Sequence, residues 1–162
     1  MQRSLVGSEM CIRDSSRTIM ADVYKTVLIG QSADRMYGLV TDVARYPEFL
    51  PWCGGVEIFE QTETVLAAKI NIQFKGITQF FHTRNVNHRP ETIDMVFVDG
   101  PFKHFSGQWN FIPLREDACK VEFKLHWEFK SIILDKIIGP VFGHIAGTFV
   151  DCFVKRAEEL YD

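Results

Sequence analysis

The stretch that decides the fold runs from Ser131 to Tyr161 and reads SIILDKIIGPVFGHIAGTFVDCFVKRAEELY. Its apolar side chains recur at steps of three and four residues, the period of one face of an α-helix. They are Leu134, Ile138, Phe142, Ile145, Phe149, Phe153, Ala157 and Leu160. One straight helix of this length would span about 45 Å at about 1.5 Å per residue, more than a small domain is wide. We therefore expect a break at Gly139-Pro140, because proline lacks the N–H that a helix interior needs, and a main helix from Pro140 to about Tyr161.

Small residues interrupt the large ones on this helix, at Gly143, Ala146 and Gly147. Two interpretations stay open: another backbone packs closely there, or space is left for a ligand. A membrane span is not expected, because charged residues such as Asp135 and Asp151 punctuate the segment and charges are costly at bilayer depth.

Upstream of this helix, strand signals alternate with turn signals from Val56 to Lys130. The clearest strand is Cys119 to Lys130, where Val121, Phe123, Leu125, Trp127 and Phe129 share one face and polar residues share the other. Strict alternation is typical of an antiparallel strand with one solvated face. An earlier strand is predicted at Val23–Ile29, followed by a helix that Ser32 caps and that ends near Arg45. A sheet of this kind must bury one face, and only the C-terminal helix is long enough to cover it.

The sequence therefore predicts an α+β fold: a curved antiparallel sheet of about six to seven strands around a long C-terminal helix. Two segments are harder to interpret. The strand from Ile77 to His88 has Phe80 and Phe81 adjacent, so its inward parity is ambiguous. The loop YPEFLPWCGG (Tyr46–Gly55) carries bulky apolar residues between prolines, so it should tuck inward as a cap or lid over an opening.

Length and composition fit one intracellular domain. The 162 residues include 14 Phe and 3 Trp, which favours a bulky interior or an aromatic-lined pocket. The formal net charge of −3 gives no signature of DNA binding. The four cysteines show no metal-ligand spacing and are interpreted as free thiols in a reducing cytoplasm.

The first 19 residues show no periodicity and no hydrophobic signal-peptide region. Their text SLVGSEMCIRDS resembles a translated sequencing adapter. We therefore predict that residues 1–19 are a disordered, non-native tail and that residues 20–162 form the domain.

Five short motifs occur in order along this domain: YPEFLPWC at Tyr46–Cys53, FKGI at Phe74–Ile77, DGPFK at Asp99–Lys103, W-x-F at Trp109–Phe111 and VDxFVKRAEELY at Val150–Tyr161. Together they resemble the coenzyme Q-binding START-like family of the polyketide cyclase/START superfamily. The resemblance implies a helix-grip fold that binds ubiquinone or another lipid between sheet and helix, in support of respiratory quinone function. The alternative that it implies is a bacterial ribosome association toxin, which binds the large ribosomal subunit and blocks subunit association.

Aromatic inner-face residues are the candidates for ligand contact, because a quinone ring stacks on Trp or Phe and an isoprenoid tail needs only apolar surface. The apolar candidates are Phe49, Trp52, Phe74, Phe97, Trp109, Phe123, Trp127, Phe142, Ile145 and Phe149. His82 and Arg84, on the ambiguous strand, are the candidates to meet a polar head group. No nucleophile–base or metal-ligand spacing is present, so we expect a binding protein without catalytic residues, metal or required cofactor.

The expected partner is thus a hydrophobic small molecule, quinone or lipid. Peripheral contact with a membrane and contact with the large ribosomal subunit stay open as further partners, and DNA is not expected. The expected location is the cytoplasm, with the inner membrane surface as the place of any peripheral contact.

Overall fold

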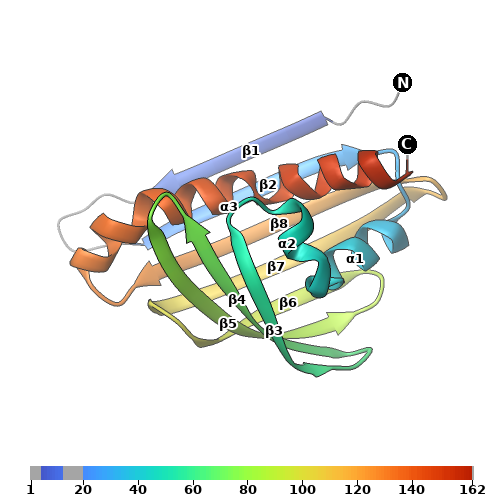
Figure 1. Ribbon diagram of the computed structural model, residues 1–162. Helices are drawn as coiled ribbons and strands as arrows, with labels where there is room; N and C mark the ends of the chain where they lie inside the picture. Colours follow the sequence, from blue (N-terminus) through green and yellow to red (C-terminus); the bar gives the residue numbers. More distant parts are fainter. Residues whose placement is uncertain (1–4, 13–19, 162) are drawn as a thin grey trace.

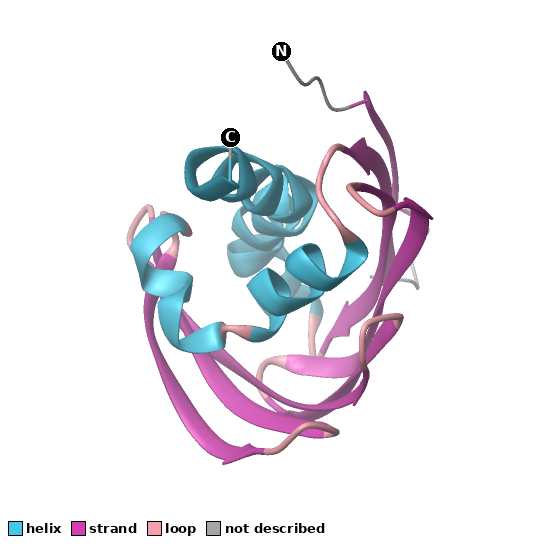
Figure 2. Ribbon diagram, turned by 90° about the vertical axis from the view of Figure 1, so that its right-hand side faces the viewer, coloured by secondary structure: helices cyan, strands magenta, loops and turns pink. Residues whose placement is uncertain are grey.

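A curved antiparallel sheet wraps around one long helix in the computed structural model, which describes residues 5–12 and 20–161 (Figures 1 and 2). The elements in chain order are β1 (Leu5–Ile12), β2 (Met20–Ile29), α1 (Ala33–Thr41), the 3₁₀ turn η1 (Val43–Arg45), α2 (Tyr46–Phe49), β3 (Cys53–Gln61), β4 (Val65–Phe74), β5 (Ile77–His88), β6 (Thr92–Asp99), β7 (Phe102–Arg115), β8 (Ala118–Phe129) and α3 (Ile132–Tyr161). The strands lie in the order β1-β2-β8-β7-β6-β5-β4-β3. Strands β2 to β8 and α3 make up the predicted helix-grip architecture, which is confirmed.

Helix α3 is continuous over its 30 residues, so the predicted break at Gly139-Pro140 is wrong. Pro140 removes one hydrogen bond, to the carbonyl of Lys136, but both residues are exposed and water can satisfy that carbonyl. The helix is long and apolar enough to cross a membrane. Its buried face packs inside the sheet, however, through residues such as Ile138, Phe142 and Phe153, as in the core helix of a globular domain.

The alternation along β8 is confirmed: Val121, Phe123, Leu125, Trp127 and Phe129 are all buried. These side chains meet the apolar face of α3, and much of the contact is between aromatic rings. The Trp127 and Phe142 rings are 5.0 Å apart, and the Phe123 and Phe149 rings are 5.5 Å apart. The core therefore lies between the concave face of the sheet and α3.

The segment between β2 and β3 closes one end of the core. Ser32 caps α1 as predicted, since its Oγ accepts a hydrogen bond from the Arg35 N–H. Helix α1 ends at Thr41, before the predicted end near Arg45, and the separate elements η1 and α2 follow, with helical angles at Tyr46 and Pro47 in the first turn of α2. Pro47 disfavours a helical Tyr46, but that residue is buried and its hydroxyl donates a hydrogen bond to the Val40 carbonyl.

Ion pairs tie the surrounding elements to one another. Lys25, a buried lysine on β2, pairs with Asp151 of α3 at 3.2 Å. Arg156 of α3 donates a hydrogen bond of 2.8 Å to Glu48 of α2.

The N-terminal tail is partly ordered as the edge strand β1, which pairs with β2 from Leu5↔Leu28 to Ile12↔Ala21. The structure describes residues 5–12 as a strand, and whether the tail is dispensable to the domain stays a prediction. Residues 1–4 and 13–19 lie outside the described part of the chain, and the prediction that the tail is non-native stays a prediction.

Candidate functional site

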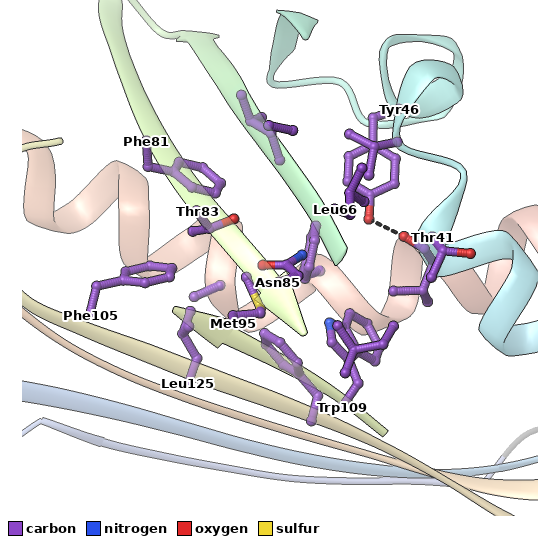
Figure 3. Close-up of a pocket in the computed structure, with 18 of the residues that line it drawn as sticks. Thr41, Tyr46, Leu66, Phe81, Thr83, Asn85, Met95, Phe105, Trp109 and Leu125 are labelled. Carbon is purple, nitrogen blue, oxygen red and sulfur yellow. Dashed lines mark hydrogen bonds between the residues drawn. The ribbon is translucent and has the colours of Figure 1, made fainter. Parts of the chain in front are cut away.

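A cavity of about 40 Å³ lies inside the core, between the sheet, α3 and the segment from α1 to β3 (Figure 3). Its lining is mostly apolar and aromatic. Helix α3 contributes Phe142, Ile145, Ala146 and Phe149, and the strands contribute residues such as Leu66, Phe81, Phe105, Trp109 and Leu125. Such a volume holds about two to four water molecules, whereas ligand sites usually measure about 300–1,000 Å³. A larger guest therefore requires the walls to move apart.

Six of the twelve predicted site residues lie in this lining: Trp52, Trp109, Phe123, Phe142, Ile145 and Phe149. Trp52, from the YPEFLPWC segment, is buried and its ring lies 5.9 Å from that of Phe149. The segment thus turns inward at Trp52, as predicted, and forms part of the wall.

Four other predicted residues pack elsewhere. Phe49 contacts Phe153 at 5.2 Å between ring centroids, and Phe74 stacks on His144 at 5.7 Å. Phe97 packs against Phe102 and Phe105, and Trp127 lies behind the Phe142 ring. These contacts belong to the packed core and its edges.

His82 and Arg84 are on the outer face of the sheet, so the interpretation that they reach inward is wrong. The His82 ring lies 4.8 Å from that of Phe59, and Arg84 pairs with Glu60 at 3.6 Å. The inward residues of β5 are the odd-numbered ones, which include Phe81 and Thr83. At this point the pairing of β5 with β6 shifts by one residue, since His82 pairs with Asp99 and Thr83 with Phe97.

The inward face of β5 carries a polar strip, which we define as Thr83, Asn85 and Asn87. All three line the cavity, and Thr83 and Asn87 are 3% and 5% exposed. Figure 3 shows Thr83 and Asn85 directed into the space between the walls. Asn85 Oδ1 and Asn87 Oδ1 are buried and have no hydrogen-bond partner among the described residues, and the same holds for Trp52 Nε1. Unpaired polar atoms in an apolar cavity are costly, so a ligand with polar groups at this strip would be favoured.

The small residues of α3 do not all border the cavity. Ala146 lies in its wall, but Gly143 and Gly147 do not. A Cβ at either glycine would meet no atom within 4 Å, so neither glycine marks a close backbone approach. Of these three small residues, Ala146 is the one that borders the cavity.

Ionisable groups are scarce around the cavity. Among the described lining residues the one ionisable side chain is Tyr46, and burial raises the pKa of its phenol. Its proton is engaged with the Val40 carbonyl, so it is poorly placed as a general acid. Within the described residues, no three His, Cys, Asp or Glu side chains come together as metal ligands would.

Sequence reasoning missed the polar strip because FFHTRNVN (Phe80–Asn87) carries polar residues on both faces. A signal was present nonetheless. Thr83, Asn85 and Asn87 are uncharged, whereas His82 and Arg84 are ionisable, and neutral polar residues are the less costly ones to bury.

The fold and the cavity between its sheet and α3 define a START-like protein of the helix-grip type. In agreement, residues 29–154 match the family described as polyketide cyclase / dehydrase and lipid transport. The chain belongs to this family. Among its relatives is the ribosome association toxin RatA of Vibrio cholerae, which is 42% identical over 142 residues, with 88% of this chain and 99% of that protein covered.

One further relative by sequence and one solved structure are also similar to this chain. The mitochondrial coenzyme Q-binding protein COQ10 homolog B of Xenopus laevis is 27% identical over 138 residues, which cover 83% of this chain and 57% of that protein. The crystal structure of the Zhui aromatase/cyclase from Streptomyces sp. R1128 matches with a TM-score of 0.68 at 16% identity, over 86% of this chain and 94% of that one. At this identity the likeness to the cyclase concerns the fold alone.

Proposed function

We propose that this protein binds one hydrophobic molecule, ubiquinone or a lipid of similar build, between the sheet and α3. The observation that carries the proposal is the cavity itself, which combines aromatic and aliphatic walls with a few inward polar atoms. This composition is typical of small-molecule sites, where apolar contact supplies affinity and a few polar groups supply orientation. The relative named as a coenzyme Q-binding protein supports a quinone as the first ligand to test.

Binding requires the cavity to open, because about 40 Å³ is far too little for a quinone ring. One wall that could move outward is the segment from α1 to α2, which contributes Thr41 and Tyr46. Exposed ion pairs hold part of it, such as Arg89–Asp34 at 2.9 Å, and such pairs stabilise by only about 0–1 kcal/mol. Outward movement of this segment would admit the ligand, and its return would exclude water.

The binding reading is favoured over catalysis by the chemistry of the walls. A reaction needs a positioned acid, base or nucleophile. The lining supplies amides, hydroxyls and an engaged phenol instead. We therefore infer a carrier or a ligand-sensing protein that releases its ligand unchanged.

The test is ligand uptake by purified protein, measured by native mass spectrometry and by titration with decylubiquinone. We expect saturable binding of one molecule. Ala146→Leu, which adds bulk to the cavity wall, should weaken it, while the neighbouring Gly147→Ala, outside the lining, should not. Absence of saturable uptake by the wild type, together with no quinone or lipid in organic extracts, would overturn the proposal.

The second candidate function is association with the large ribosomal subunit, and it is favoured by the 42% identity to a protein named ribosome association toxin. Purified protein should then co-migrate with large subunits in sucrose gradients and reduce the formation of 70S particles from separated subunits. Co-migration with neither subunit, at low and at physiological salt, would reject this function without bearing on ligand uptake.

We also propose that the protein works in the cytoplasm and touches the inner membrane when it exchanges ligand. The first turns of α3 expose Ile132, Ile133 and Ile137 by 54–69%. Exposed Lys130 precedes them in the sequence, and exposed Lys136 lies between Ile133 and Ile137. Apolar side chains flanked by lysines suit the interface of an anionic bilayer.

A further inference from the structure

The polar strip on β5 is the most unusual feature of the cavity. Successive inward residues of a strand lie about 6.5–7 Å apart, so the Asn85 and Asn87 amides form a short polar row along one wall. Their Oδ1 atoms receive no hydrogen bond from the described residues. Asn87 is anchored through its backbone N–H, which donates to the Thr64 carbonyl, so the strip is held in place while its side chains stay available.

The unpaired atoms define what a guest must offer. An Oδ1 atom accepts a hydrogen bond, so a ligand must bring a hydroxyl or another donor to pair with it. The NH₂ group of the same amide can donate hydrogen bonds to the ligand. Trp52 Nε1, on another wall, only donates and calls for a carbonyl or ether oxygen. A purely apolar guest would leave all three atoms unpaired and would bury them more deeply.

The position of the strip sets the direction of such a guest. A surface hollow of about 620 Å³ lies beside the cavity, lined by residues that include Tyr37, Arg89 and Glu91. The cavity and the hollow share Thr41, Leu66 and Asn87, so these three side chains form a common wall. The strip therefore begins at the wall nearest water and continues through Asn85 to Thr83. Beyond it lie Phe81 and the Phe105 and Phe142 rings that contact it.

We infer that Asn85 and Asn87 recognise the polar end of an amphiphilic ligand and hold it toward the Thr41–Leu66–Asn87 wall, with the apolar tail among Phe81, Phe105 and Phe142. The ligand class is a long-chain molecule whose small head carries both hydroxyl and carbonyl or ether oxygens, as a reduced quinone does. This inference rests on the proposed function and assigns to the inward face of β5 the role that the sequence suggested for His82 and Arg84.

The experiment compares two probes that share a tail. Decylubiquinol has a ring with hydroxyl and methoxy groups, and n-decylbenzene has a ring without oxygens. Binding to wild type, Asn85→Leu and Asn87→Leu is measured by ligand-dependent shifts of the melting temperature under anaerobic conditions. His82→Leu and Arg84→Leu, on the outer face of the same strand, are the matched controls.

We expect each Asn→Leu change to raise the Kd for decylubiquinol about five- to tenfold, the effect of one lost hydrogen bond. The Kd for decylbenzene should stay the same or fall. The ligand-free variants should melt at or above the wild-type temperature, because an unpaired buried amide is removed. If a leucine variant does not fold, the alanine variant at that position replaces it. The outer-face controls should bind both probes as the wild type does.

Three results would overturn the inference. Unchanged decylubiquinol binding by both asparagine variants would reject the strip while leaving the proposed function intact. An equal loss of affinity for both probes would show that the variants alter the shape of the cavity and not the recognition of the head group. Binding of neither probe by the wild type would reject the proposed function itself, and the inference with it.

Discussion

The Phe149→Ala change should weaken ligand binding, whereas Phe153→Ala, one helical turn away, should weaken only the fold. Both side chains are buried on α3, at 8% and 0% exposure, and their rings lie 5.1 Å apart. Phe149 lines the cavity and Phe153 does not. The pair therefore separates contact with the cavity from packing in general.

The size of each effect follows from this difference. Removal of a core phenylalanine costs about 3–5 kcal/mol of the free energy of unfolding. Phe149 borders empty space on one side and lacks partner atoms there, so we expect its removal to cost about 3 kcal/mol and that of Phe153 about 5 kcal/mol. A ligand that covers about 40 Å² of the Phe149 ring gains about 1 kcal/mol from it, or about fivefold in Kd.

Urea unfolding followed by circular dichroism gives the two free energies, and decylubiquinol titration of the folded variants gives the two Kd values. The reasoning would be refuted if Phe153→Ala weakened binding as much as Phe149→Ala does. It would also fail if Phe149→Ala proved the more destabilising of the two, because the ring would then have no void beside it.

Three further predictions concern other parts of the chain. Burial raises the pKa of the Cys119 thiol from 9.0 to about 11; the unfolded thiol therefore ionises first, so stability holds below pH 9 and falls from pH 9 toward pH 11. In urea titrations at pH 8 and pH 10, the free energy of unfolding of Cys119→Ala should fall less than that of the wild type. An equal fall in both proteins would contradict this prediction. The double change Ile133→Asp and Ile137→Asp should reduce sedimentation with phosphatidylglycerol vesicles without lowering the melting temperature; unchanged sedimentation would reject the membrane contact. A chain that starts at Met20 should melt within about 2 °C of the full chain, since β1 adds a single edge strand, and a drop of several degrees would show that the pairing of β1 with β2 stabilises the domain.

Periodicity was a sufficient guide wherever one face of an element is wholly apolar. Strand β8 was predicted with its correct buried face, and the face predicted for α3 is buried from Ile138 to Ala157 but not at Leu160, which is exposed. The order of strands and helices followed from turn signals. The continuity of α3 through Pro140 was missed because the cost of a proline depends on whether water reaches the freed carbonyl. That is a property of the folded surface and not of the local sequence.

The candidate site was harder to predict, for two physical reasons. On β5 both faces contain polar residues, so alternation alone does not choose between Arg84 and Asn85; the pairing of Asn85 with Leu66 and Met95 in the neighbouring strands does. The residue types in a sequence also do not reveal where the packed side chains leave a cavity. The difference between Trp109, which lines the cavity, and Trp127, which packs behind Phe142, depends on where each ring comes to rest.

The neighbourhood of β2 and β8 has a consequence for how the chain is made. The Tyr24 hydroxyl donates to Glu122 across these strands, and the two residues are 98 positions apart in the sequence. Strands β3 to β8 pair with their neighbours in succession and can form hairpins as they emerge, but β2 must wait for β8. At about 5–20 residues per second of synthesis, this wait lasts about 5–20 s. During that time β2, whose Val23 and Val27 are buried in the finished fold, lacks its pairing with β8, and closing so long a loop costs more chain entropy than forming a hairpin does.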